Sequence, residues 1–295
     1  MSDVLDNGLL TGLPSEVGYE SYWGVEACPF DNVPDPRFYV PSAKHETARG
    51  RLLYGIQARK GALLLTGEIG SGKTLLSRAL ILNLPKAKYD VALMANPSLP
   101  GNEFLGEILY QFGLPTGGSK AAQLRRLNDR LLDNSRRGLD TVLVVDEAQA
   151  ILEDRTFDDV RLLMNFQLSD RFLLTLVLLG QPELRDRVAR IPQLLQRIAI
   201  RCHLERFDAK ETRAYIESRL ASAGCRRRVF TSDAIAAIHQ RTDGVCRLIN
   251  ALCDSCLCIG HQEQLDRIDE ATVAHAARMS EFAHGAMERG DGRFS

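Results

Sequence analysis

Residues 67–74 are Gly67-Glu68-Ile69-Gly70-Ser71-Gly72-Lys73-Thr74, and they match the pattern G-x-x-x-x-G-K-[ST] of a phosphate-binding loop, or P-loop. The glycines allow a tight turn in which consecutive backbone N–H groups point into one concavity and bind phosphates. We expect Lys73 to reach the β- and γ-phosphates and the Thr74 hydroxyl to bind Mg²⁺. The loop and the following residue, Leu75, are therefore predicted to hold ATP and its magnesium ion.

The segments on either side support this interpretation over an ordinary glycine-rich turn. Residues 62–66 form a short apolar run that predicts a buried strand, and residues 75–84 predict a helix that ends before Pro85. A helix that begins at the loop directs its N-terminal N–H groups at the same phosphates.

A second motif is an apolar strand, residues 142–145, followed by Asp146 and Glu147. In P-loop proteins such a strand ends beside the loop, and its aspartate holds Mg²⁺. Glu147 then lies in position to activate water as a general base. A strand that ends in a solvated acidic turn is the alternative, and the P-loop upstream disfavours it.

Four further polar residues are candidates, each with a plainer alternative. Gln181 follows the predicted strand 173–179 and could orient the attacking water, or could simply begin a turn. Gln149 could contact the γ-phosphate or cap a turn. Arg197 could reach the nucleotide of a neighbouring subunit, and Arg247 could fold onto the phosphates, or both could be solvated surface arginines.

Composition restricts the remaining possibilities. The chain has 295 residues, is 45% hydrophobic and 25% charged, and carries a net charge of −1. This near-neutral balance neither excludes nor indicates nucleic-acid binding. The longest strongly apolar run, residues 172–180, is too short to cross a bilayer, and the acidic N-terminus lacks a secretory signal, so a cytoplasmic location is expected.

The Cys253-x-x-Cys256-x-Cys258 cluster lies in an apolar helical pattern and is expected to hold structural thiols rather than a metal.

The chain is predicted to have an α/β fold with two domains. Residues 1–45 are rich in proline and aromatic residues, and residues 284–295 are expected to form a mobile tail. Between them, residues 46–206 alternate strands and helices, which predicts a five-stranded parallel sheet between helical layers, and residues 207–283 predict only helices. The expected strands are 62–66, 90–95, 142–146, 173–179 and 199–204; the expected helices of the second domain are 210–223, 232–242, 245–260 and 270–279.

Taken together, these motifs resemble the AAA+ ATPases of the general secretion pathway protein A type, which are grouped with origin-recognition-like and transposition-regulator ATPases. The resemblance runs from about Tyr19 to about Ala277. The segments that carry it, beyond the P-loop, are Pro29-Phe30, Pro34-Asp35-Pro36-Arg37-Phe38-Tyr39, Leu52-Leu-Tyr-Gly-Ile56, Asp146-Glu147-Ala148-Gln149, Gly180-Gln-Pro-Glu-Leu184, Gln196-Arg197-Ile198 and Arg247-Leu-Ile-Asn250.

The resemblance implies a P-loop core with a helical lid, ATP between them, and an N-terminal segment that borders the adenine. It implies that Arg197 is an arginine finger acting on the next subunit and that Arg247 is the sensor arginine of the lid. Cys246 stands where the family usually has proline. Secretion-pathway members also carry a transmembrane helix and a peptidoglycan-binding domain, neither of which is found in this chain, so a role in placing a secretin is not expected of it alone.

We therefore expect a Mg²⁺-dependent ATPase that acts as an oligomer to assemble or remodel a macromolecular partner, for example an envelope secretion, pilus or polysaccharide-export system. Two alternatives stay open: a DNA-binding regulatory ATPase, and a nucleotide-dependent switch with little turnover. Intact Lys73, Asp146 and Glu147 disfavour the switch. The basic runs 125–126, 136–137 and 226–228 would serve DNA binding, but each is expected to be a solvated face.

Overall fold

A computed structural model describes residues 18–33, 36–40 and 42–279. These residues form two compact units. One comprises residues 33–207 together with residues 245–247, and we call it the α/β unit; the other comprises the described residues up to 32 together with 208–244 and the residues from 248 onward, and we call it the helical unit.

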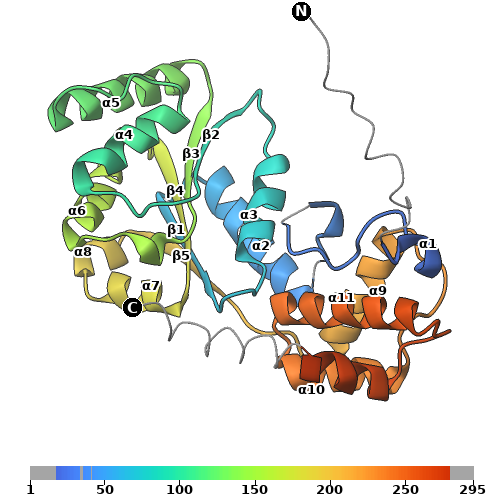
Figure 1. Ribbon diagram of the computed structural model, residues 1–295. Helices are drawn as coiled ribbons and strands as arrows, with labels where there is room; N and C mark the ends of the chain where they lie inside the picture. Colours follow the sequence, from blue (N-terminus) through green and yellow to red (C-terminus); the bar gives the residue numbers. More distant parts are fainter. Residues whose placement is uncertain (1–17, 34–35, 41, 280–295) are drawn as a thin grey trace, which may run out of the picture. The chain divides into compact units, whose positions relative to one another are not determined.

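The α/β unit is built on five parallel strands: β1 (Ala62–Gly67), β2 (Tyr89–Met94), β3 (Asp140–Val145), β4 (Leu174–Gly180) and β5 (Ile198–Leu204). Their order across the sheet is β2-β3-β4-β1-β5 (Figure 1). The predicted five-stranded parallel sheet is confirmed, and each strand lies within two residues of its expected bounds. The order places β1 inside the sheet, between β4 and β5.

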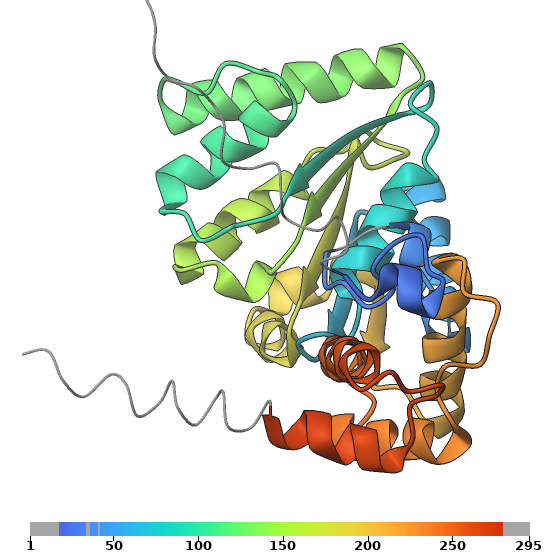
Figure 2. The ribbon, with the colours of Figure 1, turned by 45° about the vertical axis from the view of Figure 1, so that its right-hand side comes forward.

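Helices cover both faces of this sheet (Figures 1 and 2). The helices of the unit are α2 (Ala43–Gln57), α3 (Lys73–Leu82), α4 (Gly101–Gln111), α5 (Lys120–Arg136), α6 (Asp154–Leu163), α7 (Pro182–Ala189) and α8 (Pro192–Leu195), with 3₁₀ turns η1 (Pro36–Phe38) and η2 (Ala148–Ala150). Successive strand residues point to opposite faces. In β1, Leu63 and Leu65 pack against α2 and α3, whereas Leu64 packs in the core that contains α4, α5 and α6.

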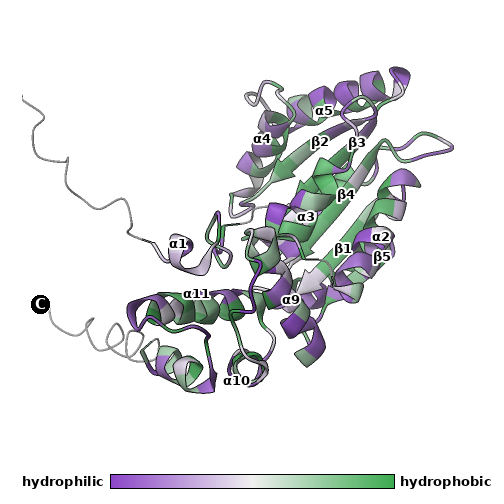
Figure 3. Cartoon of the chain, turned by 90° about the vertical axis from the view of Figure 1, so that its right-hand side faces the viewer, coloured by the Kyte–Doolittle hydropathy of each residue, from purple (hydrophilic) through white to green (hydrophobic). Residues whose placement is uncertain are grey.

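The two helical layers explain the sequence pattern of the inner strands. Strands β1 and β4 are buried along their whole length, so they are continuous apolar runs rather than alternating ones. Figure 3 shows the result: the strands of the sheet are mostly green, and polar residues lie on the outer helices.

The helical unit contains α9 (Ala209–Ser222), α10 (Ser232–Thr242), most of α11 (Cys246–Gln262) and a further helix over residues 270–279. The N-terminal segment with α1 (Glu20–Trp23) belongs to the same unit: the Trp23 indole Nε1 donates to the Leu257 carbonyl at 2.9 Å, and the Arg219 side chain donates to the Pro29 and Asp31 carbonyls. Cys253 and Cys256 are buried in α11, and burial raises the pKa of both thiols. The expected tail, residues 284–295, lies outside the described residues.

In the part of the chain that the structure describes, no helix is both long and apolar enough to cross a bilayer.

Candidate nucleotide site

The carboxyl ends of β1, β3 and β4 meet at one edge of the sheet. The P-loop follows β1, Asp146 and Glu147 follow β3, and Gln181 follows β4. The strand order therefore brings together residues that are 108 positions apart in the sequence (181 − 73 = 108). In parallel sheets this edge is where ligands bind.

The P-loop glycines are required by the backbone. Gly70 and Gly72 have φ of 77° and 89°, in the left-handed region. Gly67 is restricted by space, because an added Cβ atom would lie 2.9 Å from the Leu204 carbonyl oxygen. Since α3 begins at Lys73 without a side-chain cap, the first N–H groups of the helix are left to face the loop.

Lys73 is buried at the centre of the loop. Its ammonium donates to the Gly67 carbonyl at 2.8 Å and to the Glu68 carbonyl at 2.9 Å. Burial lowers the pKa of Lys73, and the carboxylates of Glu147 and Asp146 partly oppose that shift. The lysine thus supplies a desolvated positive charge whose interactions with an anionic ligand are little screened by water.

One polar atom of the loop has no partner. The Ser71 hydroxyl is buried and makes no hydrogen bond to any described residue. An unsatisfied buried hydroxyl is costly unless a ligand or water completes it. Together with the backbone turn at Gly70 and Gly72 and the desolvated Lys73 ammonium, this hydroxyl fits a bound phosphate group.

Asp146 is buried beside Thr74. Burial raises the pKa of Asp146, while a hydrogen bond from the Thr74 side chain and one from the Glu147 backbone N–H, at 2.9 Å, oppose the rise. A carboxylate and a hydroxyl that lie together next to a phosphate cradle form the oxygen-rich donor set that Mg²⁺ prefers. The structure thus brings together the two residues predicted to hold the metal.

Glu147 is held by a glutamine bridge. Its backbone has φ of 50°, which is strained for a residue other than glycine. The Gln149 amide donates to the Glu147 carboxylate, and its Oε1 accepts the Gln181 backbone N–H at 3.0 Å. Gly180 leaves room for this bridge, because a Cβ atom there would lie 2.6 Å from the Gln149 Oε1. Gln149 therefore connects the end of β3 to the end of β4 and orients the glutamate.

Two residues of the site were not predicted from the sequence. His45 is buried near the start of α2, with its Nε2 2.9 Å from the Ser71 carbonyl and its Nδ1 2.8 Å from the Ser42 hydroxyl. Arg187 on α7 donates to the Gln149 and Ile151 carbonyls at 2.9 and 2.7 Å and fixes the turn that carries Gln149. Neither residue belongs to a local motif, and a histidine three residues after a helix-capping serine was the only available signal.

The two predicted arginines are placed differently. Arg247 belongs to the α/β unit, and a Cβ atom added to Gly70 would lie 2.8 Å from the Cβ of Arg247, so this residue is next to the P-loop. Arg197 precedes β5 and is at the opposite edge of the sheet, where it donates to the Met164 carbonyl at 2.9 Å. The structure does not bring Arg197 to the P-loop of its own chain.

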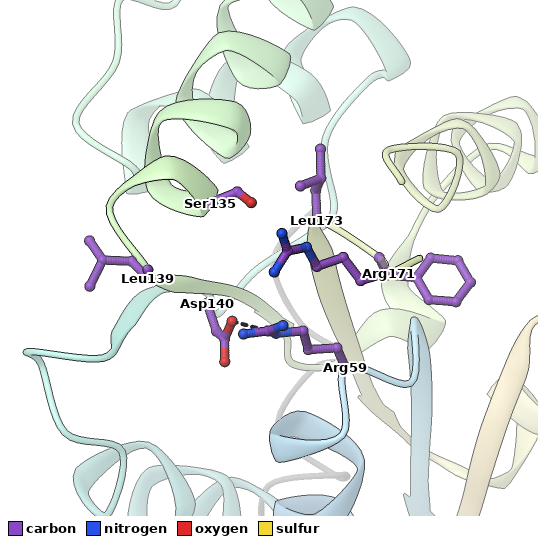
Figure 4. A pocket seen from close by; sticks show the side chains of 8 residues that line it. Arg59, Ser135, Leu139, Asp140, Arg171 and Leu173 are labelled. Atoms are coloured by element: carbon purple, nitrogen blue, oxygen red, sulfur yellow. Dashed lines mark hydrogen bonds and ion pairs between the residues drawn. The ribbon is translucent and has the colours of Figure 1, made fainter. Parts of the chain in front are cut away.

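That opposite edge carries a small polar pocket of about 30 Å³ (Figure 4). Asp140 and Arg59 face each other across it in an ion pair, with Nε 2.6 Å from Oδ1, and Arg171 extends toward them from the segment before β4. The one carboxylate in this pocket, Asp140, is paired with an arginine, unlike the carboxylates at the P-loop edge.

The sheet order, the P-loop and the Asp146-Glu147 pair are those of an AAA-type P-loop fold. The sequence of residues 56–188 matches the protein family described as the AAA domain. The chain is 37% identical over 265 residues to general secretion pathway protein A of Aeromonas hydrophila, and this match covers 88% of the chain. The resemblance predicted from the motifs is confirmed. The chain spans 48%, about half, of the length of that relative.

Solved structures of several AAA-class proteins share the fold. The Drosophila ORC bound to DNA is similar with a TM-score of 0.68 and 17% identity, over 94% of this chain and 70% of that one. The ORC2 protein of Aeropyrum pernix has a TM-score of 0.65 and 17% identity, over 86% and 72% of the two chains. The RuvB branch migration motor of Thermotoga maritima has a TM-score of 0.55 and 20% identity, over 79% and 68%. At these identities the likeness supports the fold alone.

Proposed function

We propose that the chain binds Mg²⁺ and ATP at the P-loop edge of the sheet and hydrolyses the bond between the β- and γ-phosphates. The observation that carries the proposal is the burial of Lys73, Asp146 and the unpartnered Ser71 hydroxyl around one glycine cradle, with Glu147 fixed beside them. A purely structural arrangement would neutralise these groups in an ion pair.

Each residue of the site would have a separate role in ATP binding or hydrolysis. Backbone N–H groups of residues 70–74 and the Lys73 ammonium bind the phosphates. Thr74 and Asp146 would hold Mg²⁺, and the bound ion would neutralise charge on the phosphate oxygens. The Glu147 carboxylate, oriented by Gln149, accepts a proton from water. Gln181 is proposed to orient that water.

We also propose that the active form is an oligomer. Within one chain the described residues place Arg247 near the loop but leave Arg197 at the opposite edge. An arginine finger supplied by a neighbour contributes about 10³–10⁵-fold in related phosphoryl transfers. The oligomer is proposed to drive assembly or remodelling of a macromolecular partner, and similarity to general secretion pathway protein A supports a partner in an envelope apparatus.

Steady-state ATP hydrolysis tests both proposals. Lys73→Ala should lose Mg²⁺-ATP binding and turnover, since it removes the buried cation. Specific activity should rise with protein concentration, and Arg197→Ala should be slow at every concentration. Mixing Arg197→Ala with Glu147→Gln should restore activity, because some interfaces then pair an intact finger with an intact base. A constant specific activity, unaffected by loss of Arg197, would rule out the oligomeric site but not ATP hydrolysis.

A further inference from the structure

The helical unit contains a hollow of about 430 Å³ between α9, α10 and the two segments that precede α10 and the helix of residues 270–279. Its volume is in the range of ligand sites. The floor is apolar and includes Ile216, Val229 and Phe230, all buried. The rim carries five arginines and one acid; they are Arg213, Arg226, Arg227, Arg228, Arg267 and Glu217.

Two of the five guanidinium groups have partners within the unit. Arg213 forms a long ion pair with Glu217, 3.8 Å apart on one face of α9. Arg227 stacks on the Trp23 ring, 4.7 Å from its centroid, and donates to the Tyr22 carbonyl. These contacts hold the two arginines in structural roles.

The other three, Arg226, Arg228 and Arg267, are exposed, and none forms a hydrogen bond or ion pair with another described residue. Three arginines without an ion-pair partner among the described residues thus line one concavity. In a chain of net charge −1 this is a local concentration of one sign rather than a consequence of overall composition.

The backbone that carries these arginines is fixed. Phe230 and Ile268 form an isolated parallel bridge, in which the Thr231 N–H donates to the Ile268 carbonyl at 2.9 Å and the Ile268 N–H donates to the Val229 carbonyl at 2.8 Å. Arg228 and Arg267 are each within two residues of this bridge. It therefore joins arginines that are 39 residues apart in the sequence (267 − 228 = 39) at one rim.

The chemistry of the rim favours phosphate. Guanidinium groups bind phosphate oxygens through paired N–H donors. A site that inserts into a membrane surface also presents exposed apolar side chains, and none of the large hydrophobic residues that are exposed in the described chain lines this hollow. The attraction between this arginine rim and its ligand is therefore electrostatic, as in protein contacts to the nucleic-acid backbone.

We propose that this hollow in the helical unit binds the phosphodiester backbone of a nucleic acid through Arg226, Arg228 and Arg267. The contact is independent of base sequence and does not depend on the proposed hydrolysis of ATP. It adds a nucleic-acid ligand to a chain whose net charge does not reveal one.

The test is fluorescence anisotropy of a labelled 30-base-pair duplex, titrated with the full chain between 50 and 200 mM NaCl. The triple variant Arg226→Gln, Arg228→Gln, Arg267→Gln should weaken binding at least tenfold at low salt. It should also reduce the slope of log K against log[NaCl] by about 2–3, since each phosphate contact contributes about 0.9. Each single variant should reduce that slope by about 1, which preserves the test if the triple variant folds poorly.

The matched control is Arg125→Gln, Arg136→Gln, Arg137→Gln on α5 and its C-terminal end, which removes the same charge from the other unit and should leave affinity within about twofold. The proposal is overturned if the wild-type chain does not bind the duplex, or if both triple variants lose affinity equally. It is also overturned if a poly-glutamate peptide or anionic phosphatidylserine vesicles compete as well as unlabelled duplex. ATP turnover without DNA is measured in parallel, so that failure of this proposal is distinguished from failure of the proposed ATPase.

Discussion

Strand β3 carries an aspartate at each end, and the two aspartates have opposite surroundings. Asp140, at the first residue of the strand, has a side chain only 10% exposed and is paired with Arg59. Asp146, just past the last residue, is also buried, but it contacts a hydroxyl and a backbone N–H rather than a cation. Both are the same residue type at the two ends of one strand, so the difference comes from the neighbours alone.

The comparison shows how charge is used in this fold. Removing one partner of a buried ion pair is destabilising, because the other charge is then buried without a partner. A buried carboxylate without one is costly, and burial accordingly raises the pKa of Asp146. A protein can retain a buried carboxylate that is unfavourable for folding where a ligand supplies the positive charge. This is the role proposed for Mg²⁺ at the P-loop edge.

The largest expected effect is that of Glu147→Gln. The amide has the same shape and can still accept the hydrogen bond from Gln149, but it cannot take a proton from water. Turnover should fall about 10²–10⁴-fold, while the affinity for ATP, measured by calorimetry, stays within a few-fold of the wild type. A rate within threefold of the wild type would exclude Glu147 as the base.

A smaller effect is expected for Gln149→Ala, which removes the bridge between the Glu147 carboxylate and the Gln181 N–H. The base remains but is no longer oriented, so turnover should fall about tenfold with unchanged ATP affinity. If ATP affinity falls instead and turnover at saturation is preserved, Gln149 contacts the nucleotide and does not orient the glutamate.

The smallest effect is expected for His45→Ala. Loss of one hydrogen bond to the Ser71 carbonyl should loosen the P-loop and raise the Kd for ATP about fivefold, corresponding to about 1 kcal/mol. His45→Gln should recover most of the affinity, since its amide can donate near the position of Nε2. The half-buried His275, outside this unit, provides the control; His275→Ala should bind ATP like the wild type. Equal affinity in all three variants would remove His45 from the site.

The same comparison explains what the sequence could predict. The five strands could be predicted within two residues because β1 and β4 are continuous apolar runs and β5 alternates buried and exposed residues, and because the P-loop and the Asp146-Glu147 pair are local patterns. The Gln149 bridge depends on β3 lying beside β4, and the His45 contact depends on where α2 packs, so neither is encoded in a short stretch. The pairing of Arg59 with Asp140 joins residues 81 positions apart and had no signal in the sequence.

The most direct test compares Asp146→Asn with Asp140→Asn in two assays, Mg²⁺-ATP turnover and thermal unfolding in EDTA without nucleotide. Asp146→Asn should reduce turnover at least 100-fold and leave the melting temperature unchanged or higher, because it removes an unpaired buried charge. Asp140→Asn should leave turnover within twofold and lower the melting temperature by about 2–4 °C, which corresponds to about 1 kcal/mol for a domain of this size. Asp146 would not be a metal ligand held in an unpaired state if Asp146→Asn destabilises the ligand-free protein as much as Asp140→Asn does, or if this variant hydrolyses ATP at the wild-type rate.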